Sequence, residues 1–174
     1  MKRMTENFLK KLKDVKLLAM DFDGVHTDGL VYMNEDGGEA VICSRVDGMG
    51  LELLRAHSDV KTCVISKEEN LVVAARCRKL KIVCHQGIEG GEGKLETLKK
   101  IMSEDNLGNT EVIYIGDDVN DIPCLKEVIG VAVANARPEV KKITQYTTAA
   151  FGGGGAIREI CDFILEAKGI KIVL

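Results

Sequence analysis

Three aspartates fall within the nine residues of DFDGVHTDG, which spans residues 21–29 and follows the aliphatic run VKLLAM. Because side chains alternate along a strand, Asp21 and Asp23 share one face at the carboxyl end of a predicted buried strand. Two carboxylates so close together need a cation, and Mg²⁺ suits them because it prefers oxygen ligands and often bridges a carboxylate to a substrate phosphate. One aspartate could then attack phosphorus while the second passes a proton to the leaving alkoxide. The pair therefore indicates phosphoryl chemistry at a metal site.

Two other interpretations of this stretch fail. A calcium-binding EF-hand loop needs an oxygen ligand at its fifth position and glycine at its sixth, but Val25 and His26 occupy these positions. A helix cap needs one aspartate before a helical run, whereas the residues that follow predict a β-hairpin. Phosphate chemistry remains.

Further polar residues follow other predicted strands. Ser66 in VISKEEN comes just after a strand, where its hydroxyl could bind a phosphate oxygen. Lys94 in GEGKLETL is expected at a helix start, where its ammonium and the helix dipole both favour an anion. The stretch YIGDDVND places three carboxylates after the fourth strand, where they could complete a metal site: Asp117, Asp118 and Asp121. Each residue alone has an ordinary structural explanation, but their common placement at strand ends favours a site.

The elements that must position these residues alternate along the chain. Strand-like runs occur at LLAM, VKTCVIS, KIVCH, EVIYIG and VIGVAVA, and amphipathic runs such as MGLELLRAH, NLVVAARCRKL and KLETLKKIMS separate them. This alternation predicts a doubly wound parallel α/β sheet, in which ligands bind outside the carboxyl ends of the strands. Residues 30–44, LVYMNEDGGEAVICS, interrupt the pattern and predict a β-hairpin. Two further helices are expected, one in the first sixteen residues and one at AIREICDFILEAK.

Composition limits the function further. The chain has 174 residues, 45% of them apolar, so we expect a single domain over residues 1–174. The formal net charge of -3 gives no basic field for nucleic acid, and no apolar run approaches the roughly 18 residues that span a bilayer. The N-terminal MKRMTENFLKKLKDVK lacks the apolar stretch of a signal peptide. We therefore expect a cytoplasmic protein without a nucleic-acid or membrane partner.

The cysteines and histidines predict no metal site of their own. The six cysteines form no CxxC pair, and Cys63 and Cys84 lie inside strand-like runs, so we expect reduced and mostly buried thiols. A zinc site would need clustered cysteine and histidine, but His26, His57 and His85 are scattered along the chain.

Taken in order, Asp21/Asp23, Ser66, Lys94 and the acidic GDDVND cluster resemble the four motifs of the haloacid dehalogenase superfamily of phosphohydrolases. The stretches DFDGVHTDGLVYM, VDGMGL, YIGDDVND and GGGGAIRE resemble its capless branch of sugar-acid phosphate phosphatases more narrowly. The resemblance covers residues 15–168. It implies the Rossmann-like fold of that superfamily, with a hairpin in place of a cap domain.

The resemblance also implies a role for each site residue. Asp21 would be the nucleophile that forms an aspartyl-phosphate, and Asp23 would be the general acid and base. Ser66 and Lys94 would hold the phosphoryl group. The implied Mg²⁺ site comprises Asp21, Asp23, Asp117 and Asp118, with Asp121 behind them. The implied substrate is 3-deoxy-manno-octulosonate 8-phosphate or a related nonulosonate 9-phosphate.

The resemblance further implies a homotetramer, in which the hairpins join and a neighbouring subunit helps to close each site. An exposed two-stranded hairpin is marginal alone and leaves open strand edges, which agrees with that expectation. The hairpin is thus the expected interface between subunits.

The chain departs from the branch at Ser66-Lys67-Glu68, where relatives usually carry Thr-Gly-Arg. Lys67 is a candidate to replace the lost positive charge, and Arg45 is a candidate contact for the carboxylate of a sugar acid. A rival hypothesis takes the chain as a non-catalytic oligomerisation module associated with a sugar-acid cytidylyltransferase. Against it, a scaffold has no reason to keep several carboxylates crowded together at a repulsive cost. The expected protein is therefore an enzyme, a phosphoric monoester hydrolase.

Overall fold

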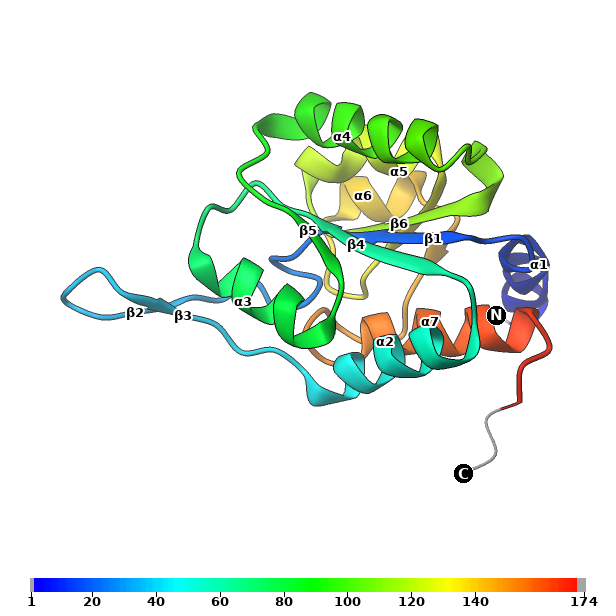
Figure 1. Cartoon of the computed structure of the whole chain (residues 1–174), viewed down its shortest axis with the longest axis horizontal. Helices are drawn as coiled ribbons and strands as arrows, with labels where there is room; N and C mark the ends of the chain where they lie inside the picture. Colours follow the sequence, from blue (N-terminus) through cyan, green and yellow to red (C-terminus); the bar gives the residue numbers. More distant parts are fainter. Residues whose placement is uncertain (1, 172–174) are drawn as a thin grey trace.

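A central sheet of six parallel strands organises the molecule, whose computed structural model describes residues 2–171 (Figure 1). In sheet order the strands are β5 (Val83–His85), β4 (Lys61–Ile65), β1 (Leu17–Met20), β6 (Val112–Gly116), β7 (Ile129–Ala132) and β8 (Tyr146–Thr147). The five strand-like runs of the sequence are confirmed. β8 is not predicted, because a two-residue edge strand is too short to show a pattern.

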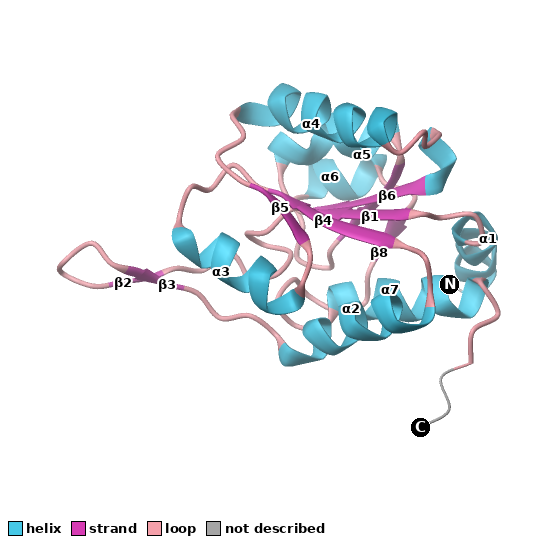
Figure 2. Ribbon diagram, in the orientation of Figure 1, coloured by secondary structure: helices cyan, strands magenta, loops and turns pink. Residues whose placement is uncertain are grey.

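Helices cover both faces of this sheet (Figure 2). One face carries α2 (Arg45–His57), α3 (Leu71–Leu80) and α7 (Ala156–Ala167). The other carries α4 (Gly90–Glu104), α5 (Ile122–Glu127) and α6 (Pro138–Ile143). Around β6 lie two short 3₁₀ helices, η1 (Asn109–Glu111) and η2 (Val119–Asp121). This arrangement confirms the doubly wound α/β fold, although α5 and α6, with six residues each, are too short for a helical period to predict them.

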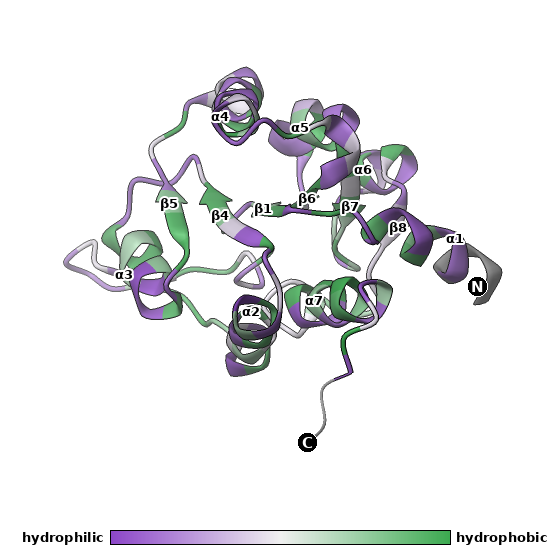
Figure 3. Ribbon diagram, turned by 45° about the vertical axis from the view of Figure 1, so that its right-hand side comes forward, coloured by the Kyte–Doolittle hydropathy of each residue, from purple (hydrophilic) through white to green (hydrophobic). Residues whose placement is uncertain are grey.

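The core lies between the sheet and the two helical layers, as the apolar strands in Figure 3 show. Every residue of β1, β6 and β7 is buried, which follows from helices packing on both faces of a parallel sheet. At the sheet edge, Phe8 of α1 (Lys2–Leu12) stacks on Tyr146 with 4.5 Å between ring centroids. Val15 lies beyond the end of α1 at Leu12, although the helix is expected within the first sixteen residues, and its side chain is buried. None of the helices within residues 2–171 has the length and apolarity to cross a membrane.

The predicted hairpin is confirmed and projects from the globular body (Figure 1). Its strands, β2 (Tyr32–Met33) and β3 (Glu39–Ala40), pair in antiparallel orientation. The side chain of Asn34 closes the turn by accepting a hydrogen bond from the N–H of Gly38 at 2.7 Å. Every residue from 30 to 40 is exposed, and only Val41 and Cys43, where the hairpin returns to the body, pack against the core.

The crossovers bring three strand ends together. From β1 the chain passes through α2 to β4 and through α3 to β5, and it then crosses through α4 to β6, β7 and β8 on the other side. The order therefore reverses at β1, whose carboxyl end lies between those of β4 and β6. Ligands of such sheets bind at this switch point. Asp21, Ser66 and Asp117 directly follow β1, β4 and β6, so the topology alone places them side by side.

Candidate active site

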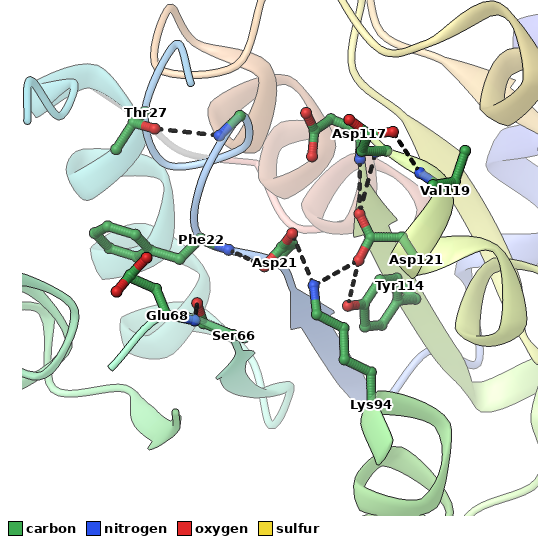
Figure 4. Close-up of polar contacts among 12 residues, drawn as sticks. Asp21, Phe22, Thr27, Ser66, Glu68, Lys94, Tyr114, Asp117, Val119 and Asp121 are labelled. Carbon is green, nitrogen blue, oxygen red and sulfur yellow. Dashed lines mark hydrogen bonds and ion pairs between the residues drawn. The ribbon is translucent and has the colours of Figure 1, made fainter. Parts of the chain in front are cut away.

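Asp21 lies at the base of the site, directly after β1 (Figure 4). Its carboxylate is buried, and Oδ1 accepts a hydrogen bond from the backbone N–H of Phe22 at 2.7 Å. Oδ2 forms an ion pair with Lys94, 2.8 Å from Nζ. The backbone N–H of Asp21 donates to the carbonyl of Ile115 in β6 at 2.9 Å. Both the backbone and the side chain of Asp21 are therefore fixed.

Lys94 reaches from α4 to the strand ends and is 0% exposed. The prediction that Lys94 lies at a helix start is wrong, because α4 begins at Gly90 and Lys94 lies in its second turn. The sequence does not indicate that α4 begins this early, because the glycines at 90, 91 and 93 have low helix propensity. Gly91 is required by packing, because a Cβ there would lie 2.9 Å from the carbonyl oxygen of Asn120. The partners of Lys94 are therefore carboxylates rather than a helix terminus.

Asp121 uses both carboxylate oxygens within the chain (Figure 4). Oδ1 accepts hydrogen bonds from Nζ of Lys94 and from the hydroxyl of Tyr114, each at 2.9 Å. Oδ2 accepts from the backbone N–H groups of Asp117, at 3.0 Å, and Asp118, at 3.4 Å. These donors match the roughly four lone-pair positions of a carboxylate. Asp121 therefore orients Lys94 and the loop after β6, with little capacity left to bind a metal directly.

Asp117 is half-buried and approaches the opening stretch at Gly24. Gly24 has a φ of +75°, and a Cβ at this position would overlap the carboxylate of Asp117. Only glycine satisfies both the backbone angle and the close approach. Asp118 is exposed, and its Oδ1 accepts a hydrogen bond from the N–H of Val119 at 2.7 Å.

Two adjoining clefts open at this base. One has a volume of about 500 Å³, and its lining includes Asp21, Asp23, Ser66 and Lys67. The other, of about 460 Å³, shares Asp21, Asp23 and Lys67 with the first and extends over Asp117 and Asp118. A substrate in these clefts would contact the strand ends and the two loops beside them.

The structure brings together eight of the predicted residues: Asp21, Asp23, Ser66, Lys67, Lys94, Asp117, Asp118 and Asp121. Arg45 is the exception, because it is exposed at the first residue of α2 and lines neither cleft. Its contact with a substrate stays a prediction.

Burial and crowding raise the pKa values of the site's carboxylic acids. Burial raises the pKa of Asp21 to about 8, the charge of Asp121 adds to the effect, and Lys94 opposes it. Burial likewise raises the pKa of Asp117 to about 7, assisted by neighbouring carboxylates. Burial acts to lower the pKa of Lys94, but Asp21 and Asp121 outweigh it, so this pKa is raised and the ammonium persists. The raised pKa values indicate that the ionised carboxylates are unfavourable at this site unless a further cation is present.

The carboxylates fit a divalent cation. Oxygen atoms of Asp21, Asp117 and Asp121 lie within 4.8 Å of one another. In the described part of the chain, Lys94 is the only cation ion-paired with this cluster, so the carboxylates outnumber the ammonium. A hard divalent cation with oxygen ligands would relieve the excess charge. Because the hydrogen bonds of Asp121 are already complete, Asp21 and Asp117 are the carboxylates best placed to bind it directly.

Two residues that support the site are not predicted from the sequence. Tyr114 is predicted only as a strand residue, although a tyrosine inside a fully buried strand signals that its hydroxyl needs a partner. Asp47 is buried, and its oxygens accept from the N–H groups of Gly155, at 3.2 Å, and Arg158, at 2.9 Å. It therefore caps α7 and holds the glycine-rich loop, whose residue 153 donates from its N–H to the carbonyl of Val25 at 2.9 Å.

The fold and the site define a class of protein. The family described as haloacid dehalogenase-like hydrolase matches residues 57–158, and the chain belongs to this family of hydrolases. Within it, the chain is similar to the 3-deoxy-D-manno-octulosonate 8-phosphate phosphatase of Escherichia coli K12. The two are 33% identical over 167 residues, which cover 95% of this chain and 87% of the relative.

Solved structures agree with this placement. A probable YrbI family phosphatase from Pseudomonas syringae pv. phaseolica 1448a superposes with a TM-score of 0.89 at 40% identity, covering 94% of this chain and 92% of that one. The 3-deoxy-D-manno-octulosonate 8-phosphate phosphatase of Moraxella catarrhalis, in complex with magnesium, phosphate and KDO, superposes with a TM-score of 0.88 at 31% identity, covering 94% and 93%.

Proposed function

We propose that this protein is a Mg²⁺-dependent phosphatase that hydrolyses a phosphorylated sugar acid, either 3-deoxy-manno-octulosonate 8-phosphate or a related nonulosonate 9-phosphate. The observation that carries the proposal is the buried ion pair between Asp21 and Lys94 at the base of an open cleft. The similarity to the Escherichia coli phosphatase over 95% of this chain supports the substrate class. The magnesium and phosphate ions bound by the Moraxella catarrhalis relative support the metal and the phosphoryl chemistry.

In the proposed reaction Asp21 attacks the phosphorus atom, and the bond between phosphorus and the sugar oxygen breaks. Asp23 gives its proton to the departing alkoxide, which leaves as the sugar hydroxyl. Water then attacks the aspartyl-phosphate while Asp23 takes the proton of that water, which releases inorganic phosphate and restores Asp21. Burial and the nearby carboxylate of Glu68 raise the pKa of Asp23, which suits a group that must donate a proton first. Ser66 and Lys94 hold the phosphoryl oxygens.

Mg²⁺ would be held by the carboxylates of Asp21 and Asp117 and by the backbone carbonyl of Asp23, with Asp118 beside them at the rim of the site. When bound, the metal neutralises the excess negative charge and allows a dianionic phosphate to approach the carboxylates. Asp121 keeps Lys94 and the loop after β6 in position through its hydrogen bonds. Lys67, which lines both clefts, is the proposed contact for the negative charge of the sugar acid.

The exposed hairpin supports the further proposal that the enzyme works as a homotetramer. Tyr32 is 74% exposed and Ile42 is 78% exposed, which is unfavourable for large apolar side chains of an isolated subunit. Both outer edges of the hairpin also lack strand partners in its two-stranded sheet. Pairing of hairpins from several subunits would bury the side chains and satisfy the edges.

The rival hypothesis, a non-catalytic oligomerisation module, has less support. Its motivation is the Ser66-Lys67-Glu68 stretch, yet Ser66 keeps its position after β4 and lines the cleft. A buried ammonium between two carboxylates is costly to desolvate, and a scaffold gains nothing from that cost. The network around Lys94 therefore favours the enzyme.

The proposal is tested by measuring phosphate release from sugar-acid phosphates and simple sugar phosphates, with and without Mg²⁺. We expect Mg²⁺-dependent release that is fastest with a sugar-acid phosphate and is abolished by Asp21→Asn. Asp28→Asn is the matched control, because Asp28 is exposed and only accepts a hydrogen bond from the N–H of Leu30, which asparagine can also accept. No release from any ester, together with no effect of Mg²⁺ on thermal unfolding, would favour the oligomerisation module instead.

A further inference from the structure

Tyr114 donates its hydroxyl to the same oxygen that binds the ammonium of Lys94. This tyrosine lies in the middle of β6 and is 0% exposed. Its hydroxyl is 2.9 Å from Oδ1 of Asp121, and Nζ of Lys94 is also 2.9 Å from that oxygen. On its other side, Nζ lies 2.8 Å from Oδ2 of Asp21. The four side chains thus form a continuous buried chain that ends at the proposed nucleophile (Figure 4).

Lys94 is shared between two carboxylates at nearly equal distances, 2.8 Å and 2.9 Å. How strongly each carboxylate attracts the ammonium depends on the other hydrogen bonds that the same oxygen accepts, because these partly neutralise its charge. The hydroxyl of Tyr114 weakens the attraction of Asp121 in this way. Without it, Asp121 would draw the ammonium away from Asp21.

We propose that Tyr114 is a positioning residue of the phosphatase reaction, which acts through Asp121 to keep the ammonium of Lys94 against Asp21 and the phosphoryl group. This inference rests on the proposed function. Tyr114 touches neither substrate nor metal in this scheme. A purely structural hydroxyl would be satisfied by any buried acceptor, whereas this one binds the oxygen that also binds Lys94.

The test is Tyr114→Phe, which removes one oxygen atom and keeps the ring. We expect kcat for phosphate release to fall about 10-fold or more, the loss typical of one hydrogen bond to a charged group, with a smaller change in KM. The matched control is Tyr146→Phe, because the hydroxyl of Tyr146 also donates to a carboxylate, Oε1 of Glu159, at 2.8 Å. Tyr146 lies in β8, separated from β1 by β6 and β7, so its loss is expected to leave kcat unchanged.

A double-mutant cycle distinguishes positioning from structural support. If Tyr114 acts through Asp121, Tyr114→Phe lowers kcat in the natural sequence but adds nothing in an Asp121→Asn background. An equal loss of kcat in both backgrounds would overturn the proposal. So would a Tyr114→Phe variant that loses thermal stability but keeps the kcat of the unaltered chain.

Binding of inorganic phosphate separates this inference from the proposed function. If the unaltered chain hydrolyses no ester, the proposed function fails, but calorimetry with Mg²⁺ and inorganic phosphate still reports on Lys94. Weaker phosphate binding by Tyr114→Phe than by Tyr146→Phe supports the positioning role. Equal binding by the two variants refutes it, and the measurement at low temperature serves even if Tyr114→Phe is too unstable for kinetics.

Discussion

The buried base of the site, made by Asp21, Lys94, Tyr114 and Asp121, differs from the hairpin of residues 30–44 in where its partners come from. The four side chains of the base contact one another within one chain, at distances of 2.8 to 2.9 Å. The hairpin leaves its outer strand edges and several large apolar side chains exposed. A single chain therefore brings the proposed catalytic residues together, whereas the hairpin is the region that we propose pairs with other chains.

The largest effect is expected from Lys94→Met, which removes the central group of the base. Asp21 and Asp121 would be left buried without a counter-charge, so the free energy of unfolding should fall by about 3–5 kcal/mol. Phosphate release should fall by about 10²–10³-fold, because a preorganised donor to the phosphoryl group is lost. Urea unfolding and phosphate-release kinetics measure the two effects.

The control for that prediction is Lys99→Met in the same helix. Lys99 pairs with Glu127 at 3.2 Å on the surface, where ion pairs contribute little. If Lys99→Met lost as much activity as Lys94→Met, the buried base would not be the source of catalysis.

The next largest loss of activity is expected from Gly24→Ala in the site, which is compared with a glycine substitution in the hairpin. The new Cβ would overlap the carboxylate of Asp117, and a displacement of that size costs on the order of 10²-fold in rate. Gly37→Ala in the hairpin is the control, because Gly37 also has a positive φ, +78°, but no atom lies within 4 Å of its Cβ position. We expect both variants to lose some stability through backbone strain and only Gly24→Ala to lose activity. Equal activities would show that residue 24 does not constrain the site.

A smaller effect concerns His26, which is buried and stacks on Phe22 with 5.4 Å between ring centroids. Burial, assisted by Arg76, lowers the pKa of His26 from 6.5 to about 3. Between these values the unfolded chain binds the extra proton, so stability falls as the pH falls, by up to about 1.4 kcal/mol per pH unit. We expect the free energy of unfolding, measured with urea, to fall between pH 7 and pH 5. For His26→Phe this fall should be about 2 kcal/mol smaller than for the unaltered chain.

The exposed His57→Phe serves as the control for this pH dependence. This variant should lose as much stability between pH 7 and pH 5 as the unaltered chain does. If His26→Phe lost as much as well, acid sensitivity would arise elsewhere in the chain.

The smallest effect within a subunit is expected from Tyr32→Ser in the hairpin. Because this side chain packs against no core residue of its own chain, unfolding of the isolated subunit should not change measurably. Sedimentation should instead show loss of the tetramer, since the change removes apolar surface from the proposed interface. A variant that stays tetrameric would place the interface outside the hairpin.

The placement of Asp21, Ser66 and Asp117 could be predicted because each directly follows a strand. Alternating strand and helix patterns fix which residues lie at carboxyl ends, and parallel topology then places Asp21, Ser66 and Asp117 at one edge of the sheet. The hairpin was also visible, because turn residues between two apolar runs act locally. The start of α4 was predicted wrongly, because the packing of Gly91 against Asn120 outweighs the low helix propensity of glycine.

The sequence by itself therefore determined the α/β class, the strand ends that carry the acids, and the residue types suited to phosphate and metal. Only the tertiary structure decided which partners they have. Lys94 and Asp121 are 27 residues apart in the chain, and Asp47 caps a helix that begins more than a hundred residues later. Such contacts depend on how distant elements pack, which no local periodicity encodes. For the same reason, only the fold shows that the hydroxyl of Tyr114 donates to Asp121.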